Sequence, residues 1–310
     1  MIQPKLSSIL SVVTMLSALM LHAPTAPAQS ADSIKAARRA AECARCAEWN
    51  KPQVPFRIFG DTYFVGPNGL SVLLLKSNNG LILLDAALPE SAPLIAANIA
   101  TLGFNVHDIK YIVNSHDHFD HAGGIADMQK VSGAKVASSA LSAPVLRRGH
   151  SEKDDPQFGL LNAFPPVSNI VIVRDGEAIK VGDITLTPHF TPGHTPGGTT
   201  WTWQSCEGTH CIDLVYADSQ TAVSADNFLF THNTTYPNAI KDFEHSFTVL
   251  ETLPCDVLIT PHPDASNFWQ RVAARDAGNP NALIDTKACK NYAAAAREQL
   301  ARRIARELGK

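Results

Sequence analysis

The sequence is poor in charge and lacks a basic block, and these absences narrow the classes of protein it can belong to. Only 18% of its 310 residues are charged, and the formal net charge is −3 at pH 7 with neutral histidines. No run of lysine and arginine interleaved with aromatic residues occurs, which argues against a nucleic-acid partner. Beyond residue 21, no apolar stretch approaches the roughly 20 residues that span a bilayer. With 45% hydrophobic residues, the composition is that of an ordinary globular protein with a large core.

The N-terminal segment differs from the rest of the chain. Lys5 is the only charged side chain before Asp32, residues 9–21 are almost entirely apolar, and a small-x-small pattern ends at Ala28. These features predict a secretory signal peptide, residues 1–28, and export to the periplasm. A membrane anchor is the alternative, but roughly 13 apolar residues are too few to span a bilayer. We therefore expect no membrane association after cleavage.

All six cysteines lie beyond the predicted cleavage site, as expected in an oxidising compartment. Their positions predict two disulfides, one closing a hairpin and one tying a strand to the C-terminal helix: Cys206 with Cys211, and Cys255 with Cys289. Cys43 and Cys46 remain, with CxxC spacing, at the end of an Ala- and Arg-rich segment that predicts a short helix or an arm. A local disulfide and free thiols both stay open for this pair. A redox motif or zinc knuckle lacks a supporting second pair.

Residues 116–121, His-Asp-His-Phe-Asp-His, place three imidazoles and two carboxylates in six consecutive positions. His116 and His118 are separated by one residue, so in an extended segment both face the same side and can bind one cation. Asp120 and His121 point away from that pair, and a carboxylate with an imidazole suits a second ion. An apolar strand pattern precedes the run and a helical pattern follows it, which is where sheet-based enzymes carry their chemistry. A polar loop without metal is the alternative, and the density of ligand-type side chains disfavours it.

Two distant histidines complete the predicted sites. His194 lies in a Pro/Gly loop after one predicted strand, and His262 directly follows another. Zinc sites typically take three protein ligands and leave one position for water. The sequence therefore predicts two zinc ions per chain, held by two ligand sets: His116, His118 and His194; Asp120, His121 and His262.

Strand and helix patterns alternate along the rest of the chain. Strands are predicted at residues 56–60, 62–66, 70–77, 81–85, 109–114, 134–137, 169–173, 178–181, 184–190, 199–204 and 256–259. Helices are predicted at residues 91–102, 124–131, 142–148, 242–253, 267–274 and 286–307. Asp85 ends a very apolar strand, where an unpaired carboxylate would be costly, so we expect it to bond the backbone of the 116–121 run. The irregular stretch at residues 149–167 is of the length that is often functional.

With the six predicted ligands in this order, the chain resembles the metallo-β-lactamase superfamily. The resemblance implies an α/β (α+β) fold, a four-layer αβ/βα sandwich of two mixed sheets with helices outside and the metals in a cleft at one sheet edge. It also implies a single structural domain over residues 29–310, with halves at about residues 50–190 and 191–310.

Within the superfamily, the chain is similar to class B β-lactamases of subclass 3, from about residue 55 to residue 290. The commonest subclass has a Cys ligand in the loop after residue 217, whereas residues 218–230 contain no Cys and His121 takes its place. Another subclass has Asn at the first ligand position, where this chain has His116.

The similarity implies a secreted dizinc β-lactamase that hydrolyses penicillins, cephalosporins and carbapenems with a zinc-bound hydroxide. The first zinc would polarise the carbonyl oxygen and the second would stabilise the departing amide nitrogen, with Asp120 orienting the nucleophile and Asp85 supporting the metal loop. Residues 218–230 contain neither Lys nor Arg, so hydroxyls would bind the substrate's carboxylate. The implied substrate contacts are Ser219, Thr221 and Gln157. A small-molecule substrate and a monomer are expected.

Sister families with the same fold hydrolyse thioesters or lactones, and a glyoxalase II-like enzyme is the main alternative. Those enzymes bridge both metals with an Asp between the last two His ligands, and Asp218 lies in that interval. The flanking Tyr-Ala-Asp-Ser sequence and the Trp201–Trp203 strand favour the lactamase, with Asp218 not a ligand. An inactive zinc-binding protein would predict a missing ligand, and none is missing.

Overall fold

The structure is a computed structural model that describes residue 1 and residues 43–309. The predicted signal peptide, apart from its first residue, lies outside the described residues. Within them, no helix has both the length and the apolar character needed to cross a membrane.

A seven-stranded mixed sheet holds the first part of the chain, with strand order β1-β2-β3-β4-β5-β6-β7. Neighbouring strands from β1 to β4 pair antiparallel, and those from β4 to β7 pair parallel. Parallel neighbours need crossover connections, which contain helices on one face of this sheet. The strands are β1 (Phe56–Phe59), β2 (Thr62–Phe64), β3 (Leu73–Ser77), β4 (Gly80–Leu84), β5 (Ile109–Val113), β6 (Lys135–Ser138) and β7 (Ile170–Ile172). The helices are α2 (Cys46–Trp49), η1 (Pro89–Ser91), α3 (Ala92–Thr101), η2 (Val106–Asp108), α4 (Phe119–Ala122), α5 (Ile125–Ser132) and α6 (Ser142–Arg148).

A five-stranded sheet holds the rest, with strand order β12-β11-β10-β9-β8. Its strands are β8 (Ile179–Val181), β9 (Ile184–Phe190), β10 (Thr199–Glu207), β11 (His210–Tyr216) and β12 (Val257–Ile259). Only the β11–β12 pair is parallel among these described strands, and α7 lies in the connection between them. The helices are α7 (Ala239–Thr252), η3 (Pro263–Ser266), α8 (Phe268–Asp276) and α9 (Ala288–Glu307).

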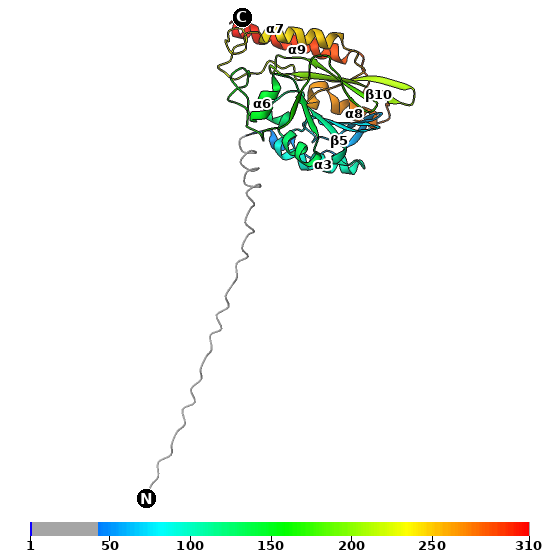
Figure 1. Cartoon of the computed structure of the whole chain (residues 1–310). Coiled ribbons are helices and arrows are strands. Elements are labelled where there is room, and N and C mark those ends of the chain that lie inside the picture. The colour runs from blue at the N-terminus through cyan, green and yellow to red at the C-terminus, as the bar shows by residue number, and fades with distance from the viewer. Residues whose placement is uncertain (2–42, 310) are drawn as a thin grey trace.

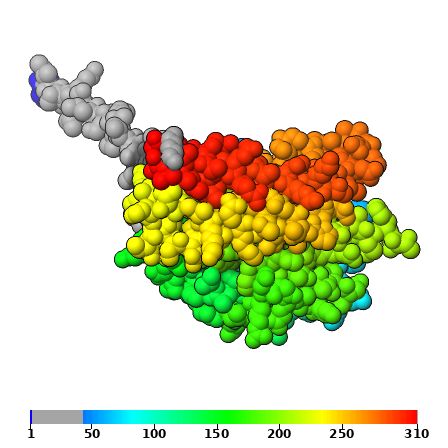
Figure 2. Space-filling model, turned by 90° about the horizontal axis from the view of Figure 1, so that it is seen from above, coloured from blue at the N-terminus to red at the C-terminus, as the bar shows by residue number. Residues whose placement is uncertain are grey.

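Three hydrophobic clusters separate four layers. Because side chains alternate along a strand, Leu83 of β4 faces one cluster and Ile82 faces the next. The first cluster packs the large sheet against α3, α5 and α6, the second lies between the two sheets, and the third packs the small sheet against α7 and α9. The helices α3 and α7 therefore lie on opposite outer sides (Figure 1), and α9 runs beside α7 on the same face (Figure 2). This arrangement confirms the predicted αβ/βα sandwich.

Two tryptophans of β10, Trp201 and Trp203, belong to the layer between the sheets. Trp201 and Trp203 are 0% and 4% exposed, and both contribute to the second cluster. Because they are two residues apart on β10, their side chains lie on the same face of the sheet.

The sulfur atoms of the six cysteines lie at bonding distance in three pairs: Cys43 with Cys46, Cys206 with Cys211, and Cys255 with Cys289. The second pair faces across the β10–β11 hairpin, and the third joins the residue segment before β12 to the first turn of α9. Both pairings predicted from spacing are present in the structure, and the pairing that the sequence left open is present as well.

Candidate metal centre

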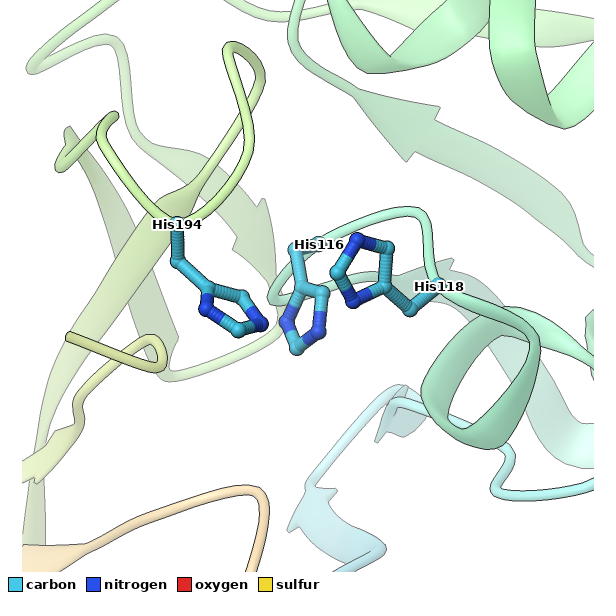
Figure 3. Close-up of side chains that lie close together, drawn as sticks. All are labelled: His116, His118 and His194. Carbon is cyan, nitrogen blue, oxygen red and sulfur yellow. The ribbon is translucent and has the colours of Figure 1, made fainter. Parts of the chain in front are cut away.

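The predicted ligands converge from three segments, each of which follows a strand. His116 and His118 follow β5, and His118 precedes α4 as its N-cap residue. Asp120 and His121 lie within α4 itself. His194 lies in the loop between β9 and β10 and faces the β5 loop from the other side (Figure 3). The remaining ligand, His262, lies shortly after β12. Each sheet therefore contributes the end of a parallel strand to the site.

His116, His118 and His194, the first group, bring their rings together in the interior. Ring centroids lie 4.7 Å apart for His116 and His118, and 4.9 Å from each of these rings to that of His194. One ring nitrogen of each residue lies within 4.8 Å of the others, and Nε2 of His116 is buried without a hydrogen-bond partner. A buried nitrogen without a partner is costly unless something binds it, so this atom fits a metal ion.

The charge state of two of the three first-group rings suits metal binding. Burial holds the pKa of His116 well below its ordinary value. Burial, followed by the neighbouring His118, lowers the pKa of His194 to about 3. Both rings are therefore neutral at pH 7, and a neutral imidazole offers a lone pair to a metal. Burial lowers the pKa of the third ring, His118, but Asp155 raises it by more, so its net pKa lies above the ordinary value.

Each ring of the first group is held by an acceptor on its outer nitrogen. The three contacts are His116 Nδ1 to Asp218 Oδ1 at 2.9 Å, His118 Nε2 to Asp155 Oδ2 at 3.0 Å, and His194 Nδ1 to the carbonyl oxygen of Thr221 at 2.8 Å. An N–H that donates outwards leaves the other nitrogen with its lone pair directed at the centre, the usual arrangement behind metal-binding histidines. The rings are therefore oriented by the protein itself.

The second group consists of Asp120, His121 and His262. Its ligand atoms lie close together, but the group is more exposed to solvent than the first. Nε2 of His121 lies 3.2 Å from Nε2 of His262, and one Asp120 oxygen lies 3.3 Å from both nitrogens. Burial raises the pKa of Asp120, but the two histidines lower it further, so its net pKa is well below the ordinary value. An ionised carboxylate and two converging imidazole nitrogens form a donor set that suits a transition metal. The His262 side chain remains 32% exposed.

Asp85 is buried next to the segment after β5 that carries His116 and His118. Its carboxylate accepts hydrogen bonds from the Ser115 amide at 2.7 Å, the Ser115 hydroxyl at 2.7 Å and the Tyr216 hydroxyl at 2.7 Å. Burial raises the pKa of Asp85 to about 7, although these hydrogen bonds oppose the rise. The sequence predicted a contact with the backbone of the 116–121 run, and the amide that Asp85 binds belongs to Ser115, one residue before that run. The Tyr216 contact, 131 residues away, was not predicted.

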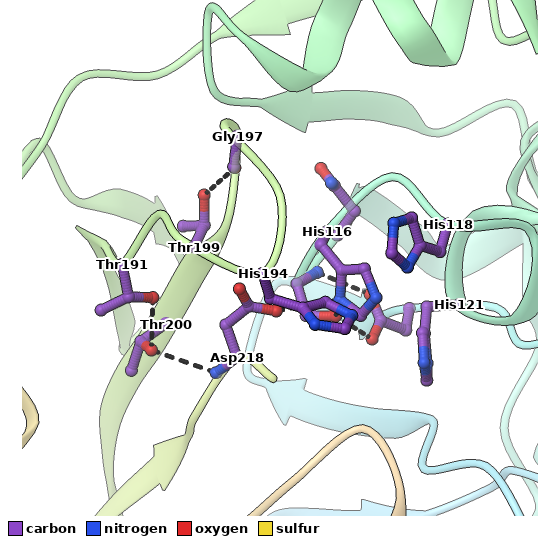
Figure 4. A network of polar contacts seen from close by, with 12 residues as sticks. His116, His118, His121, Thr191, His194, Gly197, Thr199, Thr200 and Asp218 are labelled. Carbon is purple, nitrogen blue, oxygen red and sulfur yellow. Dashed lines mark hydrogen bonds and ion pairs between the residues drawn. The ribbon is translucent and has the colours of Figure 1, made fainter. Parts of the chain in front are cut away.

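Asp218 lies behind His116 rather than beside the second group (Figure 4). Its amide donates to the Thr200 hydroxyl at 3.1 Å, and that hydroxyl pairs with the Thr191 hydroxyl at 2.9 Å. Gly198 permits the approach, because a Cβ there would lie 2.2 Å from Asp218 Oδ2. Asp218 is therefore placed to orient His116, not to lie between the two groups.

A cavity of about 470 Å³ opens over both groups. The three residues expected to contact a substrate, Gln157, Ser219 and Thr221, all line it. The sequence did not predict four further features: the Asp155 contact to His118, and the positions of Arg45, Trp49 and Tyr292 in the cavity wall. Asp155 lies in the irregular stretch at residues 149–167, and only the folded loop shows that it bonds His118.

A family model described as the Metallo-beta-lactamase superfamily matches residues 65–262. Among solved structures, the chain is 52% identical to the Rm3 metallo-beta-lactamase, with a TM-score of 0.84 and coverage of 86% of this chain and 98% of that one. It is 46% identical to MEM-A1, a subclass B3 metallo-beta-lactamase from a soil metagenome library, with a TM-score of 0.82 and coverage of 84% and 99%.

Curated relatives with other activities match more weakly. A hydroxyacylglutathione hydrolase of Maricaulis maris is 33% identical over 40% of this chain and 42% of its own length. An N-acyl homoserine lactonase of Agrobacterium fabrum is 35% identical over 32% of this chain and 37% of its own length. The chain spans about half the length of the curated relatives it matches.

Proposed function

Because the chain belongs to the metallo-beta-lactamase superfamily of hydrolases, we propose that it is a dizinc β-lactamase of the B3 type that opens the amide bond of penicillins, cephalosporins and carbapenems. The observation that carries this proposal is the second group. It contains His121 beside Asp120 and His262 in one cavity with the first group, as expected from the resemblance to subclass 3.

The chemistry divides between the metals and the chain. When bound, two zinc ions would acidify water and polarise the substrate's carbonyl. The first group would hold one ion and the second group the other, while Asp218, Asp155 and the Thr221 carbonyl keep the first three rings in place. Asp120, ionised at neutral pH, would also accept a hydrogen bond that orients the nucleophile.

The cavity wall would position the substrate. Ser219 and Thr221 line the cavity, and their hydroxyls would donate to a carboxylate. The Gln157 amide lies near His194, with 3.4 Å between their nitrogens. The apolar side chains of Leu161 and Val223 also line the cavity and would exclude water from one side of the substrate.

A thioesterase of the glyoxalase II type, or a lactonase, is the second candidate, because curated relatives carry those names. The position of Asp218 favours the lactamase, since an acid that bonds the outer nitrogen of His116 is not placed to bridge two metals. Whole-chain similarity to the solved β-lactamases favours the same choice.

We also propose that the chain is exported through residues 1–28, is active as one domain and is a monomer in the periplasm. Fractionation of expressing cells, N-terminal sequencing of the recovered protein and its sedimentation test these points. A protein retained in the cytoplasm with Met1 intact would contradict the export proposal.

The activity is tested on the mature protein, residues 29–310, loaded with zinc. We expect turnover of a chromogenic cephalosporin and of a carbapenem, loss of turnover with a chelator, recovery with zinc, and two zinc ions per chain. The matched control is His107→Ala, which removes an exposed imidazole that belongs to neither group. Turnover of a glutathione thioester without turnover of either β-lactam would replace the proposal with the second candidate.

A further inference from the structure

Apart from the two proposed metal ions, the cavity offers little positive charge to an anionic substrate. Besides Asp120, the acidic residue Asp264 lines it, and the loop at residues 218–230 carries neither Lys nor Arg. Only hydroxyls from that loop face a substrate's carboxylate. A full positive charge would bind a carboxylate more strongly than neutral donors do.

Arg45, near the beginning of residues 43–309, carries such a charge. It is the N-cap residue of α2 and the one Lys or Arg among the described residues that line the cavity. The carbon of its guanidinium group lies 5.1 Å from the centre of the Trp49 ring, within the range of a cation–π contact. The Trp49 ring centroid in turn lies 5.1 Å from that of His262. The guanidinium is therefore connected through one indole to the second group.

The backbone around Arg45 is fixed to the rest of the protein. The pairing of Cys43 with Cys46 encloses Arg45 in a four-residue ring, and Cys46 is only 2% exposed. The Gly69 amide donates to the Trp49 carbonyl at 3.0 Å, directly after this ring. A side chain on a fixed backbone loses less conformational entropy when it binds a ligand.

The guanidinium is also free to change partners. Its ion-pair partner is Glu48 at 3.5 Å, and both side chains are 58% exposed. Exposed ion pairs of this kind contribute little because water screens them. A substrate carboxylate in the less exposed cavity would accept two parallel hydrogen bonds from the same planar group, which a lysine cannot offer.

We propose that Arg45 is a specificity-determining residue that binds a carboxylate of the substrate on the His262 side of the cavity. The choice of a β-lactam as that substrate rests on the proposed function. The positive charge compensates for the absence of Lys and Arg from residues 218–230.

The test compares Arg45→Gln and Arg45→Lys with the wild type and with Arg302→Gln. Arg302 is a matched control, because its side chain is 60% exposed and it forms a similar weak ion pair, with Glu298 at 3.4 Å. Two substrates are used: a penicillin whose one carboxylate is on the ring system, and a penicillin whose acyl side chain carries a second carboxylate. Zinc content and thermal midpoint are measured for every variant.

We expect Arg45→Gln to raise KM about tenfold with kcat nearly unchanged, because a charge-assisted contact is lost. The difference from wild type should shrink at high salt, and Arg45→Lys should recover part of it. An equal effect on both penicillins assigns Arg45 to the ring carboxylate, and an effect on the second alone assigns it to the side-chain carboxylate. A KM equal to that of Arg302→Gln for both substrates would overturn the proposal.

Failure of the Arg45 proposal can be distinguished from failure of the proposed β-lactamase function. If the wild type hydrolyses no β-lactam, the proposed function fails, and calorimetric binding of the dianionic penicillin to the zinc-loaded protein decides the role of Arg45. Binding about tenfold weaker in Arg45→Gln supports the contact. Equal binding, or none by the wild type, refutes it.

Discussion

The two ligand groups lie side by side, yet the protein supports them differently. Every ring of the first group is buried and bonds an acceptor through its outer nitrogen. In the second group, His262 is 32% exposed and packs against the Trp49 ring, and no acceptor for its outer nitrogen occurs among residues 43–309. Ligands that the protein already holds in place lose little conformational entropy when a metal binds. We therefore expect the first group to bind zinc more tightly than the second.

Removing a first-group ligand should have the largest effect. His116→Ala leaves two ligands in a buried site, so we expect loss of one zinc and a fall in kcat/KM of about 10³-fold or more. Metal analysis and steady-state kinetics measure both quantities, with His107→Ala as the control. Full activity with one zinc fewer would show that the second group alone supports catalysis. The second group, not the first, would then matter more for activity.

Stepwise removal of metal comes next. We expect a graded chelator series to remove one zinc before the other, and His262→Ala to weaken the more labile zinc by about 100-fold while the tighter one stays bound. Metal content is measured at each free-zinc concentration. If His262→Ala weakened the tighter zinc instead, the order of affinities argued from burial would be wrong.

Asp155→Asn tests the outer contacts of the first group. The amide keeps the shape but not the charge that holds His118, so zinc affinity at the first group should fall about 10- to 100-fold. Asp154→Asn is a matched control, since Asp154 is the exposed neighbour in the same loop. Equal zinc affinities in the two variants would mean that the outer contact contributes nothing to metal binding.

The ligand sets were predictable because they depend on residue type and on strand ends, which sequence patterns reveal. His116 and His118 lie shortly after β5, and His262 shortly after β12. The contacts that distinguish the two groups were not predictable in this way. Asp155 meets His118 across 37 residues and the Thr221 carbonyl meets His194 across 27, through loops whose course depends on packing rather than on periodicity.

The arrangement of the layers was likewise only partly predictable from the sequence. The strand and helix succession was compatible with the sandwich, but only the family resemblance implied two sheets with helices outside. The α2 helix illustrates why. It lies at the end of residues 29–50, whose Ala- and Arg-rich pattern predicted a short helix or an arm. The placement of Arg45 and Trp49 in the cavity wall depends instead on the Cys43–Cys46 ring and on contacts with Gly69.

The smallest effect is expected at Tyr292, which supports the turn between Asp218 and Thr221. Its hydroxyl donates to the Asp218 carbonyl at 3.1 Å and accepts from the Gln220 amide at 3.1 Å. The same turn holds His116 through the Asp218 side chain and His194 through the Thr221 carbonyl. Loss of this hydroxyl should therefore loosen two rings of the first group and leave the second group unchanged.

Tyr292→Phe measures that difference directly. We expect zinc affinity at the first group to fall about threefold to tenfold, at the lower end of effects from supporting contacts, with the second group unaffected. Tyr63→Phe is the control. Tyr63 packs edge-on against Phe104 in the first hydrophobic cluster, on the face of the large sheet that is turned away from the small sheet. In the cobalt-substituted protein, the absorption bands of the first-group ion should shift in Tyr292→Phe and stay constant in Tyr63→Phe. If both variants kept the wild-type spectrum and zinc affinity, the orientation of these rings would depend on Asp218 and Thr221 without any support from α9.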